Sequence, residues 1–225
     1  MLTVVATPIG NLGDLSPRAA QALEDAAVWF VEDTRVSGKL QSHLGIKRPM
    51  RVLNEHTSPA KVAQYALEVS TCERAVVLTD AGTPAVSDPG AELVQACLEL
   101  GVEVDAVPGP SAVTTALALS GFYAQRFAFL GYPPRKPGPL RQLLEPYRDS
   151  PLTLVLFESP HRVGKLLAAC SAALGERRYA ICRELTKAHQ QVWRGRLPEA
   201  PSEGQVPYKG EVTLAVEGRR SGPRV

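Results

Sequence analysis

The chain has 225 residues, 44% of them hydrophobic, which excludes a disordered protein and allows one large domain or two small ones. The net charge is +2, but residues 1–120 carry 8 basic and 14 acidic side chains (8 − 14 = −6), and residues 121–225 carry 17 and 9 (17 − 9 = +8). The basic half predicts contact with a polyanion, although scattered solvated charge explains the asymmetry equally well.

The four cysteines, Cys72, Cys97, Cys170 and Cys182, do not have the spacing of metal ligands. We therefore expect reduced thiols in or near the core of a cytoplasmic protein, and no metal site. No apolar run is long enough to span a bilayer, so no membrane contact is expected. Residues 1–6 have no basic segment before them and predict a strand rather than a signal peptide.

The first half predicts repeated units of strand, loop and helix. This alternation is typical of an α/β domain with a mostly parallel sheet covered by helices on both faces. Asp88 is expected to be the N-cap of the helix after the fourth strand, with Pro89 at its first position. The expected strands are 3–6, 28–31, 51–53, 75–78 and 102–107, and the expected helices are 17–27, 36–44, one from 59, 89–100 and 112–119.

Three loops of this half, 7–14, 79–84 and 108–112, consist mainly of small, rigid or backbone-exposing residues. Ligands of open α/β sheets bind beyond the carboxyl ends of the strands, where these loops are expected. Gly82 has no side chain, so a ligand can approach its backbone closely. The loops contain neither a dinucleotide fingerprint nor a Walker motif. They predict the floor of a small-molecule site.

A polar segment, 32–35, follows the expected strand 28–31. One interpretation is a helix N-cap at Thr34 with a local ion pair. The other is functional, because Glu32, Asp33 and Arg35 would lie beside two ligand loops.

The pattern changes near Gly121, where we place the domain boundary. We expect an N-terminal α/β domain over 1–119, a mixed α/β domain over 120–218 and a basic tail over 219–225. The expected elements of the second half are strands at 127–130, 152–157, 179–182, 191–194 and 212–216, a helix at 162–174, and a proline-rich basic loop at 131–139.

Charged side chains follow two strands of the second half. If these strands are neighbours, Arg162, Arg183 and Lys187 share an edge with Glu158 and Glu184. The groups then form either salt bridges that fix the edge or a phosphate-binding rim. The same choice between a phosphate contact and an ordinary surface loop applies to the cations of segment 131–139.

Eight short motifs, in this order, resemble those of the tetrapyrrole-methylase superfamily. Within the superfamily, the chain resembles the branch that acts on ribosomal RNA more than the branch that acts on precorrins. Members of the precorrin branch usually have Gly-Asp-Pro where this chain has Gly82-Thr83-Pro84. The motifs are Thr7-Pro8-Ile9-Gly10-Asn11-Leu12, Glu32-Asp33-Thr34-Arg35, Asp80-Ala81-Gly82-Thr83-Pro84, Ser87-Asp88-Pro89-Gly90, Pro108-Gly109-Pro110-Ser111, Glu158-Ser159-Pro160-His161-Arg162, Arg183-Glu184-Leu185-Thr186-Lys187 and Lys209-Gly210-Glu211.

The resemblance implies two α/β domains, the first with a mostly parallel sheet and the second with a mixed sheet, and S-adenosylmethionine in the cleft between them. It implies a homodimer that methylates the 2′-hydroxyl of a cytidine ribose in the decoding region of 16S rRNA, in the small ribosomal subunit. Contacts to the methyl donor carry over onto Pro8, Ile9, Gly10, Asp80, Gly82, Thr83, Val86, Ser111, Ala112, Phe157 and Leu185.

The acceptor hydroxyl is a poor nucleophile, so a catalytic group is expected in addition to alignment of the reactants. Asp33, Glu158 or Glu184 would deprotonate or orient it, and Lys187 would be the base if a neighbouring cation lowered its pKa. The candidates for RNA contact are Arg35, Arg135, Lys136, Arg162 and Arg183. The alternatives are a methylase of a small tetrapyrrole or a protein side chain, and a non-catalytic RNA-binding assembly factor.

Overall fold

A computed structural model of the chain describes residues 1–202 and 204–220, so residues 221–225 of the expected basic tail lie outside the described residues. The chain divides into two compact units, Met1–Ser111 and Ala112–Val225. Each unit has a sheet and a hydrophobic core of its own. Within the described residues, no helix is long and apolar enough to cross a membrane.

The first unit contains a five-stranded parallel sheet with strand order β3-β2-β4-β1-β5. Every residue of β2 and β4 is buried, as expected for inner strands of a parallel sheet that is covered on both faces. The strands are β1 (Leu2–Val5), β2 (Val28–Val31), β3 (Met50–Val52), β4 (Ala75–Leu78) and β5 (Val104–Val107).

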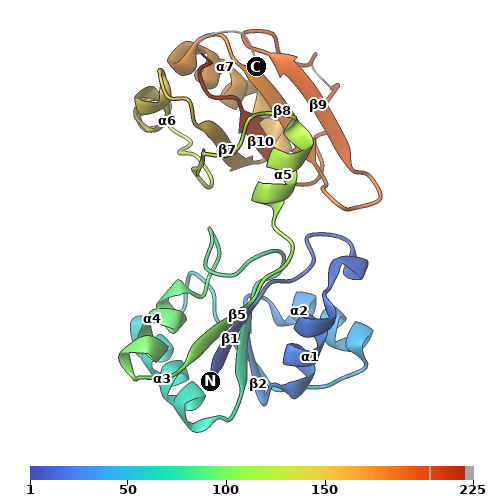
Figure 1. Ribbon diagram of the computed structural model, residues 1–225, viewed down its shortest axis with the longest axis vertical. Coiled ribbons are helices and arrows are strands. Elements are labelled where there is room, and N and C mark those ends of the chain that lie inside the picture. Colours follow the sequence, from blue (N-terminus) through green and yellow to red (C-terminus); the bar gives the residue numbers. More distant parts are fainter. Residues whose placement is uncertain (203, 221–225) are drawn as a thin grey trace. The chain divides into compact units, whose positions relative to one another are not determined.

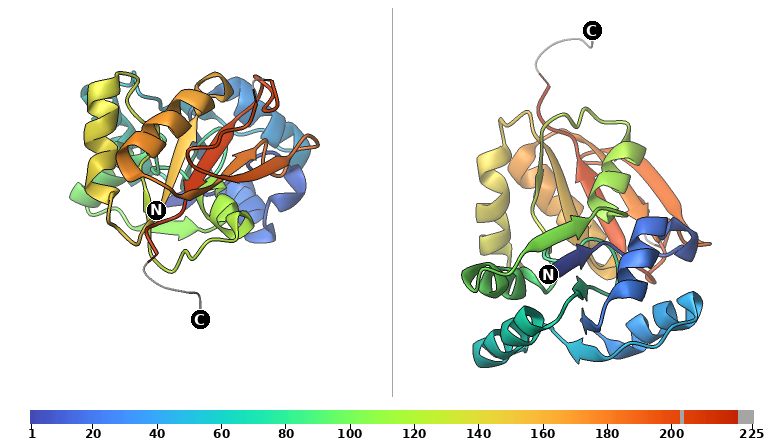
Figure 2. Two further views of the ribbon diagram at one scale, coloured as in Figure 1. Left: turned by 90° about the horizontal axis from the view of Figure 1, so that it is seen from above. Right: turned by 60° about the horizontal axis from the view of Figure 1, so that its bottom comes forward.

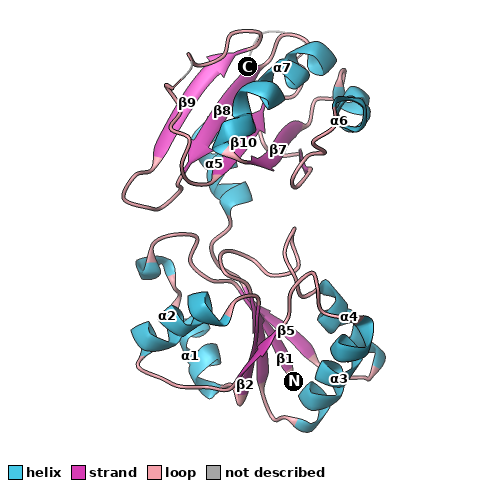
Figure 3. Cartoon of the chain, turned by 180° about the vertical axis from the view of Figure 1, so that it is seen from behind, coloured by secondary structure: helices cyan, strands magenta, loops and turns pink. Residues whose placement is uncertain are grey.

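Helices cover both faces of this sheet, with α3 and α4 on one side and α1 and α2 on the other (Figures 1 and 3). Successive strand residues point to opposite faces, which divides the core in two. Phe30 belongs to the cluster of Val62 and Leu93, whereas Trp29 belongs to that of Leu23. The helices are α1 (Pro17–Asp25), α2 (Thr34–Leu44), α3 (Pro59–Thr71) and α4 (Ala91–Glu99), and a 3₁₀ turn covers Leu12–Asp14.

The second unit contains a mixed sheet with strand order β6-β7-β10-β8-β9. The pair β6–β7 is parallel and the other pairs are antiparallel. The expected fold class, with a parallel first sheet and a mixed second sheet, is therefore confirmed. The strands are β6 (Phe127–Phe129), β7 (Thr153–Glu158), β8 (Arg178–Arg183), β9 (Gln191–Arg196) and β10 (Val212–Val216).

Helices also cover both faces of the second sheet (Figure 2). Leu154 and Leu156 of β7 pack in the same core as α6 (Pro137–Leu144) and α7 (Val163–Leu174). Val155, between them in sequence, packs instead with α5 (Ala112–Ser120). Single 3₁₀ turns cover Glu145–Tyr147 and Pro160–Arg162.

Helix α6 replaces part of the expected proline-rich loop, so that expectation was wrong. Proline is favoured in the first turn of a helix because the N–H it lacks has no partner there, and Pro137 occupies that position. Leu140 and Leu144 then lie one turn apart and are both buried. The spacing of these two leucines indicates a helix, but the prolines before them favoured the prediction of a loop.

Helix α4 begins later than expected. Its N-cap is Gly90, with φ 126°, and the first helical residue is Ala91. A Cβ atom at position 90 would lie 3.4 Å from Val77 Cγ2, so the backbone approaches β4 closely at this point. The tertiary contact, rather than the local preference for Asp88 and Pro89, sets the start of the helix.

The division between the units falls before α5, whereas the expected boundary lies after it. Val113 and Leu117 of α5 pack on Val155 of β7, which assigns the helix to the second unit. The sequence of α5 consists mostly of small or apolar residues without a charged face, and it does not indicate which sheet the helix covers.

Candidate functional site

Three loops of the first unit meet at the carboxyl ends of β1, β4 and β5. Thr7 and Gly82 exchange two backbone hydrogen bonds, with N···O distances of 2.8 and 3.1 Å. Thr7 Oγ1 donates to the Thr79 carbonyl at 3.3 Å, and Thr83 Oγ1 donates to the Pro110 carbonyl at 3.3 Å. Because β1 lies between β4 and β5, the three loops form one continuous surface at this edge.

Glycines permit this close approach. Gly82 has φ +90°, a conformation that favours glycine, and a Cβ atom there would lie 3.4 Å from Ile9 Cγ2. A Cβ atom at Gly109 would lie 3.0 Å from Ala6 Cβ. Because these glycines have no side chains, a ligand can reach the backbone N–H and C=O groups of the loops.

The structure brings together the central members of the expected donor set. Ile9, Gly82 and Thr83 belong to the joined loops, and Pro8, Gly10 and Ser111 adjoin them in sequence. Asp80 lies in the same β4 loop, and Val86 is 44% exposed further along it. Three other expected residues belong to the second unit, and these are Ala112 at the start of α5, half-buried Phe157 on β7, and Leu185, buried in the loop after β8.

A cluster of carboxylates lies beside these loops, at the ends of β2 and β4. The backbone N–H of Asp33 donates to Asp80 Oδ1 at 3.2 Å, and the backbone N–H of Asp80 donates to Glu32 Oε2 at 3.4 Å. Burial, together with the charge of Glu32, raises the pKa of the Asp80 carboxyl. Asp80 is therefore a better proton acceptor than an ordinary aspartate.

Asp33 is the N-cap of α2, and the expected N-cap, Thr34, is instead the first helical residue. Asp33 Oδ1 accepts from the Arg35 backbone N–H at 2.7 Å, and the Arg35 guanidinium bonds both carboxylate oxygens. These hydrogen bonds lower the pKa of Asp33 to about 2. The interpretation as a cap with a local ion pair therefore describes this geometry, although it applies to Asp33.

The charged loops of the second unit share one edge of the sheet. Strands β7 and β8 are not neighbours, but both run antiparallel to β10, which lies between them. Glu158 and Arg183 accordingly pair with the same residue, Val212. The carboxyl ends of β7 and β8 therefore point the same way, and the loops that follow these two strands lie at the same end of the sheet.

At this edge, Lys187 lies between two carboxylates. Its Nζ donates to Glu184 Oε1 at 3.0 Å and to Glu211 Oε2 at 2.8 Å, and the Glu211 backbone N–H also donates to Glu184 Oε1, at 3.0 Å. Glu184 has φ 50°, and Gly210 has φ +97° with no room for a Cβ atom, which would lie 2.6 Å from Glu184 Cδ.

These contacts decide the protonation of the cluster. Burial alone would lower the pKa of Lys187, but hydrogen bonds to Glu211 and Glu184 outweigh it and raise the pKa. For Glu184, burial acts to raise the pKa, and the Glu211 N–H and Lys187 together outweigh it and lower the pKa. The condition for Lys187 to act as the base, a neighbouring cation that lowers its pKa, is not met.

The other expected residues of this edge are engaged to different extents. Glu158 is 4% exposed, accepts from the Ser159 N–H at 2.8 Å, and lies 3.3 Å from Arg162 Nη2. Arg183 is 7% exposed and donates to the Lys209 carbonyl at 2.6 Å and to Gln191 Oε1 at 2.8 Å. Through Nε and Nη1, buried Arg183 holds two loops together, and its expected contact with RNA stays a prediction.

Arg135 and Lys136 are exposed where α6 begins. Glu211, by contrast, belongs to one of the family-like motifs but was not among the expected site residues. The run Lys209-Gly210-Glu211, directly before a strand, could have identified Glu211 as a site residue. The glycine of this run allows the backbone to turn against Glu184.

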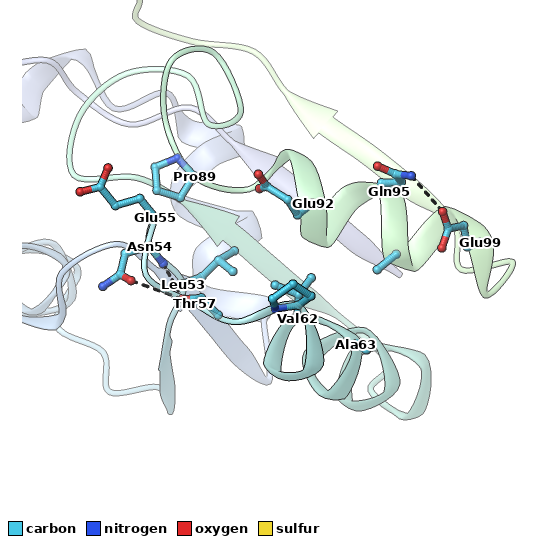
Figure 4. A pocket seen from close by; sticks show the side chains of 12 residues that line it. Leu53, Asn54, Glu55, Thr57, Val62, Ala63, Pro89, Glu92, Gln95 and Glu99 are labelled. Atoms are coloured by element: carbon cyan, nitrogen blue, oxygen red, sulfur yellow. Dashed lines mark hydrogen bonds between the residues drawn. The ribbon is translucent and has the colours of Figure 1, made fainter.

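A separate pocket of about 430 Å³ lies in the first unit between α3, α4 and the segment after β3 (Figure 4). Its rim carries Glu55, Glu92 and Glu99 around apolar residues such as Val62. None of the expected site residues lines it. Among residues 1–202 and 204–220, no group of three or more histidine, cysteine or acidic side chains could hold a metal ion.

The parallel sheet with backbone loops at its carboxyl edge, followed by a mixed sheet, defines an α/β protein of two units. The sequence profile of the tetrapyrrole (corrin/porphyrin) methylases matches residues 1–201, and the chain belongs to this family.

Within the family, relatives named "Ribosomal RNA small subunit methyltransferase I" are similar over almost the whole chain. The relative from Thermotoga maritima is 39% identical, covering 97% of this chain and 98% of its own. The relative from Synechocystis is 40% identical (97% and 79%), and that from Mycobacterium tuberculosis H37Rv is 42% identical (96% and 77%).

Solved structures of more distant proteins share the fold. Uroporphyrin-III C-methyl transferase from Thermus thermophilus, complexed with S-adenyl homocysteine, has a TM-score of 0.66 at 21% identity and covers 96% of each chain. Diphthine synthase has a TM-score of 0.71 at 14% identity, covering 96% of this chain and 90% of its own.

Proposed function

We propose that the chain is an S-adenosylmethionine-dependent methyltransferase that methylates the 2′-hydroxyl of a cytidine ribose in the decoding region of 16S rRNA. The observation that carries the proposal is the hydrogen-bonded junction of the three glycine-containing loops at the carboxyl edge of the first sheet. The name of the relatives at about 40% identity supports an RNA substrate over a tetrapyrrole. So does the concentration of positive charge in the second unit.

The residues of the first unit suit this methyl donor. A nucleoside is held by a few placed polar groups against apolar surface, and the joined loops offer backbone N–H and C=O groups next to buried Ile9. Asp80, beside them, would accept hydrogen bonds from donor hydroxyl groups. Bound there, S-adenosylmethionine supplies an electrophilic methyl group on a sulfonium centre. The remaining contacts in this unit would come from Pro8, Gly10, Gly82, Thr83, Val86 and Ser111.

We assign the acceptor side of the chemistry to the second unit. Alignment alone can supply about 7–11 kcal/mol of barrier reduction, so a strong base is not required. Glu184 would orient the hydroxyl, because Lys187 and the Glu211 N–H hold one of its oxygens. The other oxygen, Oε2, accepts no hydrogen bond from the residues that the structure describes. Lys187, kept protonated, would hold this carboxylate in place.

Glu158 and Asp33 fit positioning roles better than proton transfer. Glu158 is buried and would hold Arg162, whose side chain is 27% exposed, in place for a phosphate. Asp33 caps α2 and keeps the Arg35 side chain, 88% exposed, at the edge of the first unit. Both arginines would position RNA rather than read its bases.

The test uses undermethylated small ribosomal subunits, S-adenosylmethionine labelled in its methyl group, and nucleoside mass spectrometry. We expect one 2′-O-methylcytidine per subunit and binding of S-adenosylmethionine in calorimetry. Methylation of a precorrin but not of the subunits would support the tetrapyrrole alternative. Absence of donor binding would support a non-catalytic assembly factor.

A homodimer and a cytoplasmic location complete the proposal. The dimer rests on the family resemblance, and sedimentation equilibrium would measure it. The location is supported by four free cysteines, three of them buried, as in proteins of a reducing compartment.

A further inference from the structure

A second pocket, of about 350 Å³, lies in the second unit, and none of the residues to which we assign a role in the proposed function lines it. Two segments that are distant in sequence line it. One is the turn after β7 and the start of α7, with His161 and Lys165, and the other is the loop before β10, with Val206 and Tyr208.

The two rings of this pocket are stacked on each other. The His161 and Tyr208 ring centroids are 5.1 Å apart, and their planes differ by 6°. Tyr208 is 48% exposed and His161 is also exposed, so the pair presents an aromatic surface to solvent. Val206, 8% exposed, supplies apolar surface, and exposed Lys165 supplies a cation that forms no ion pair within the described residues.

The pocket lies at the same edge of the sheet as the charged cluster. His161 follows Glu158, the last residue of β7, after two residues. Tyr208 precedes Lys209, whose carbonyl accepts from Arg183, and Glu211 lies two residues further on, against Glu184. The pocket therefore adjoins the groups to which we assign the acceptor hydroxyl.

This combination is suited to an unpaired nucleotide. Proteins recognise single-stranded RNA by stacking bases on aromatic side chains, and cations beside the rings hold the backbone phosphates. The ring pair offers the stacking surface and Lys165 the cation, in the unit whose sequence carries net charge +8.

We propose that this pocket binds a nucleotide that flanks the target cytidine, with its base stacked on the exposed side of the Tyr208–His161 pair and its phosphate near Lys165. The proposal rests on the rRNA function above and adds a specificity site to it. Unpaired RNA, rather than duplex, is the partner that a stacking surface selects.

The experiment compares Tyr208→Ala, Tyr208→Phe and His161→Ala with the wild-type protein. Methylation of undermethylated small ribosomal subunits gives KM and kcat, and calorimetry gives the Kd of S-adenosylmethionine. Tyr123→Ala is the matched control, because Tyr123 is 50% exposed in the same unit but lies beside Thr153, at the opposite end of β7. Thermal melts verify that every variant is folded.

We expect Tyr208→Ala and His161→Ala to raise KM for the subunits about tenfold, in line with the loss of one stacked base. The Kd of S-adenosylmethionine should not change, and Tyr208→Phe, which keeps the ring, should stay near wild type. An unchanged KM in both alanine variants would overturn the inference while leaving the function intact. So would a shift of the variants in sedimentation from dimer to monomer, which would make the pocket a contact between copies. Failure of the wild-type protein to methylate the subunits would instead overturn the proposed function.

Discussion

At Gly82 the backbone conformation restricts the position to glycine. An alanine there would adopt φ +90° at a cost of about 1–2 kcal/mol, with its Cβ atom against Ile9. We expect Gly82→Ala to lower the melting temperature and to weaken binding of S-adenosylmethionine in calorimetry by at least tenfold.

Gly38 provides the control for this substitution. It lies within α2 with no atom within 4 Å of an added Cβ, so Gly38→Ala should stabilise the protein by about 0.5–1 kcal/mol and leave donor binding unchanged. Unaltered donor binding in Gly82→Ala would show that the joined loops are not the donor site.

The Lys187 cluster makes a prediction about pH. Hydrogen bonds to carboxylates on both sides outweigh burial and raise the pKa of Lys187 above its ordinary value, so it stays protonated across the working range. Protonation of Lys187 stabilises the fold at low pH, and this contribution disappears only as the pH rises through the raised pKa. We expect kcat/KM to show no lysine deprotonation between about pH 6 and 9.

The substitution Glu211→Gln tests the same cluster by removing one of the two carboxylates that bind Lys187. Loss of one carboxylate lowers the Lys187 pKa, so the alkaline decline of activity and of stability should move to lower pH. Glu184→Gln should lower kcat by about 10- to 100-fold and leave KM for the donor unchanged. A rate that increases as Lys187 deprotonates would restore the lysine as the base.

At the scale of elements, the start of α6 carries two cations that we propose contact RNA. Arg135 and Lys136 are exposed and form no ion pair within the described residues, unlike Arg162 and buried Arg183. We expect the double variant Arg135→Ala, Lys136→Ala to raise KM for the subunits about tenfold.

The salt dependence of RNA binding should change as well. Two lost contacts with single-stranded phosphates would reduce the slope of log K against log salt by about 1.4. Lys39 and Lys47, exposed in the first unit, form the control pair, and their removal should leave both quantities unchanged. A slope that is the same in both double variants would argue against a role for the α6 cations.

Elements whose signals are local agree with their sequence predictions, and elements set by distant contacts do not. Strands β2 and β4 coincide with the expected ranges because each is an uninterrupted apolar run, and β10 coincides because only Thr213 interrupts its apolar run. Helix α4 starts late because Gly90 packs against Val77. Helix α6 was missed because its buried leucines follow a segment dominated by proline.

At the scale of the whole molecule, the division at Ser111 predicts how the chain can be cut. A fragment of residues 112–225 keeps α5 on Val155, whereas a fragment of residues 120–225 exposes that face of the sheet. We expect the longer fragment to melt cooperatively in circular dichroism and the shorter one to be unfolded or aggregated. Equal stability of the two fragments would place α5 outside the second unit.

The sequence by itself determined the alternation of strands and helices, the residue types of the donor loops and the family resemblance, because these depend on local patterns of burial, glycine and proline. Only the tertiary structure decided which charges meet. The strand order β7-β10-β8 brings Glu211 to Glu184 and Lys187, and it buries Arg183 between loops. A pKa depends on the groups that surround the titrating atom, and those groups come from parts of the chain that no local pattern connects.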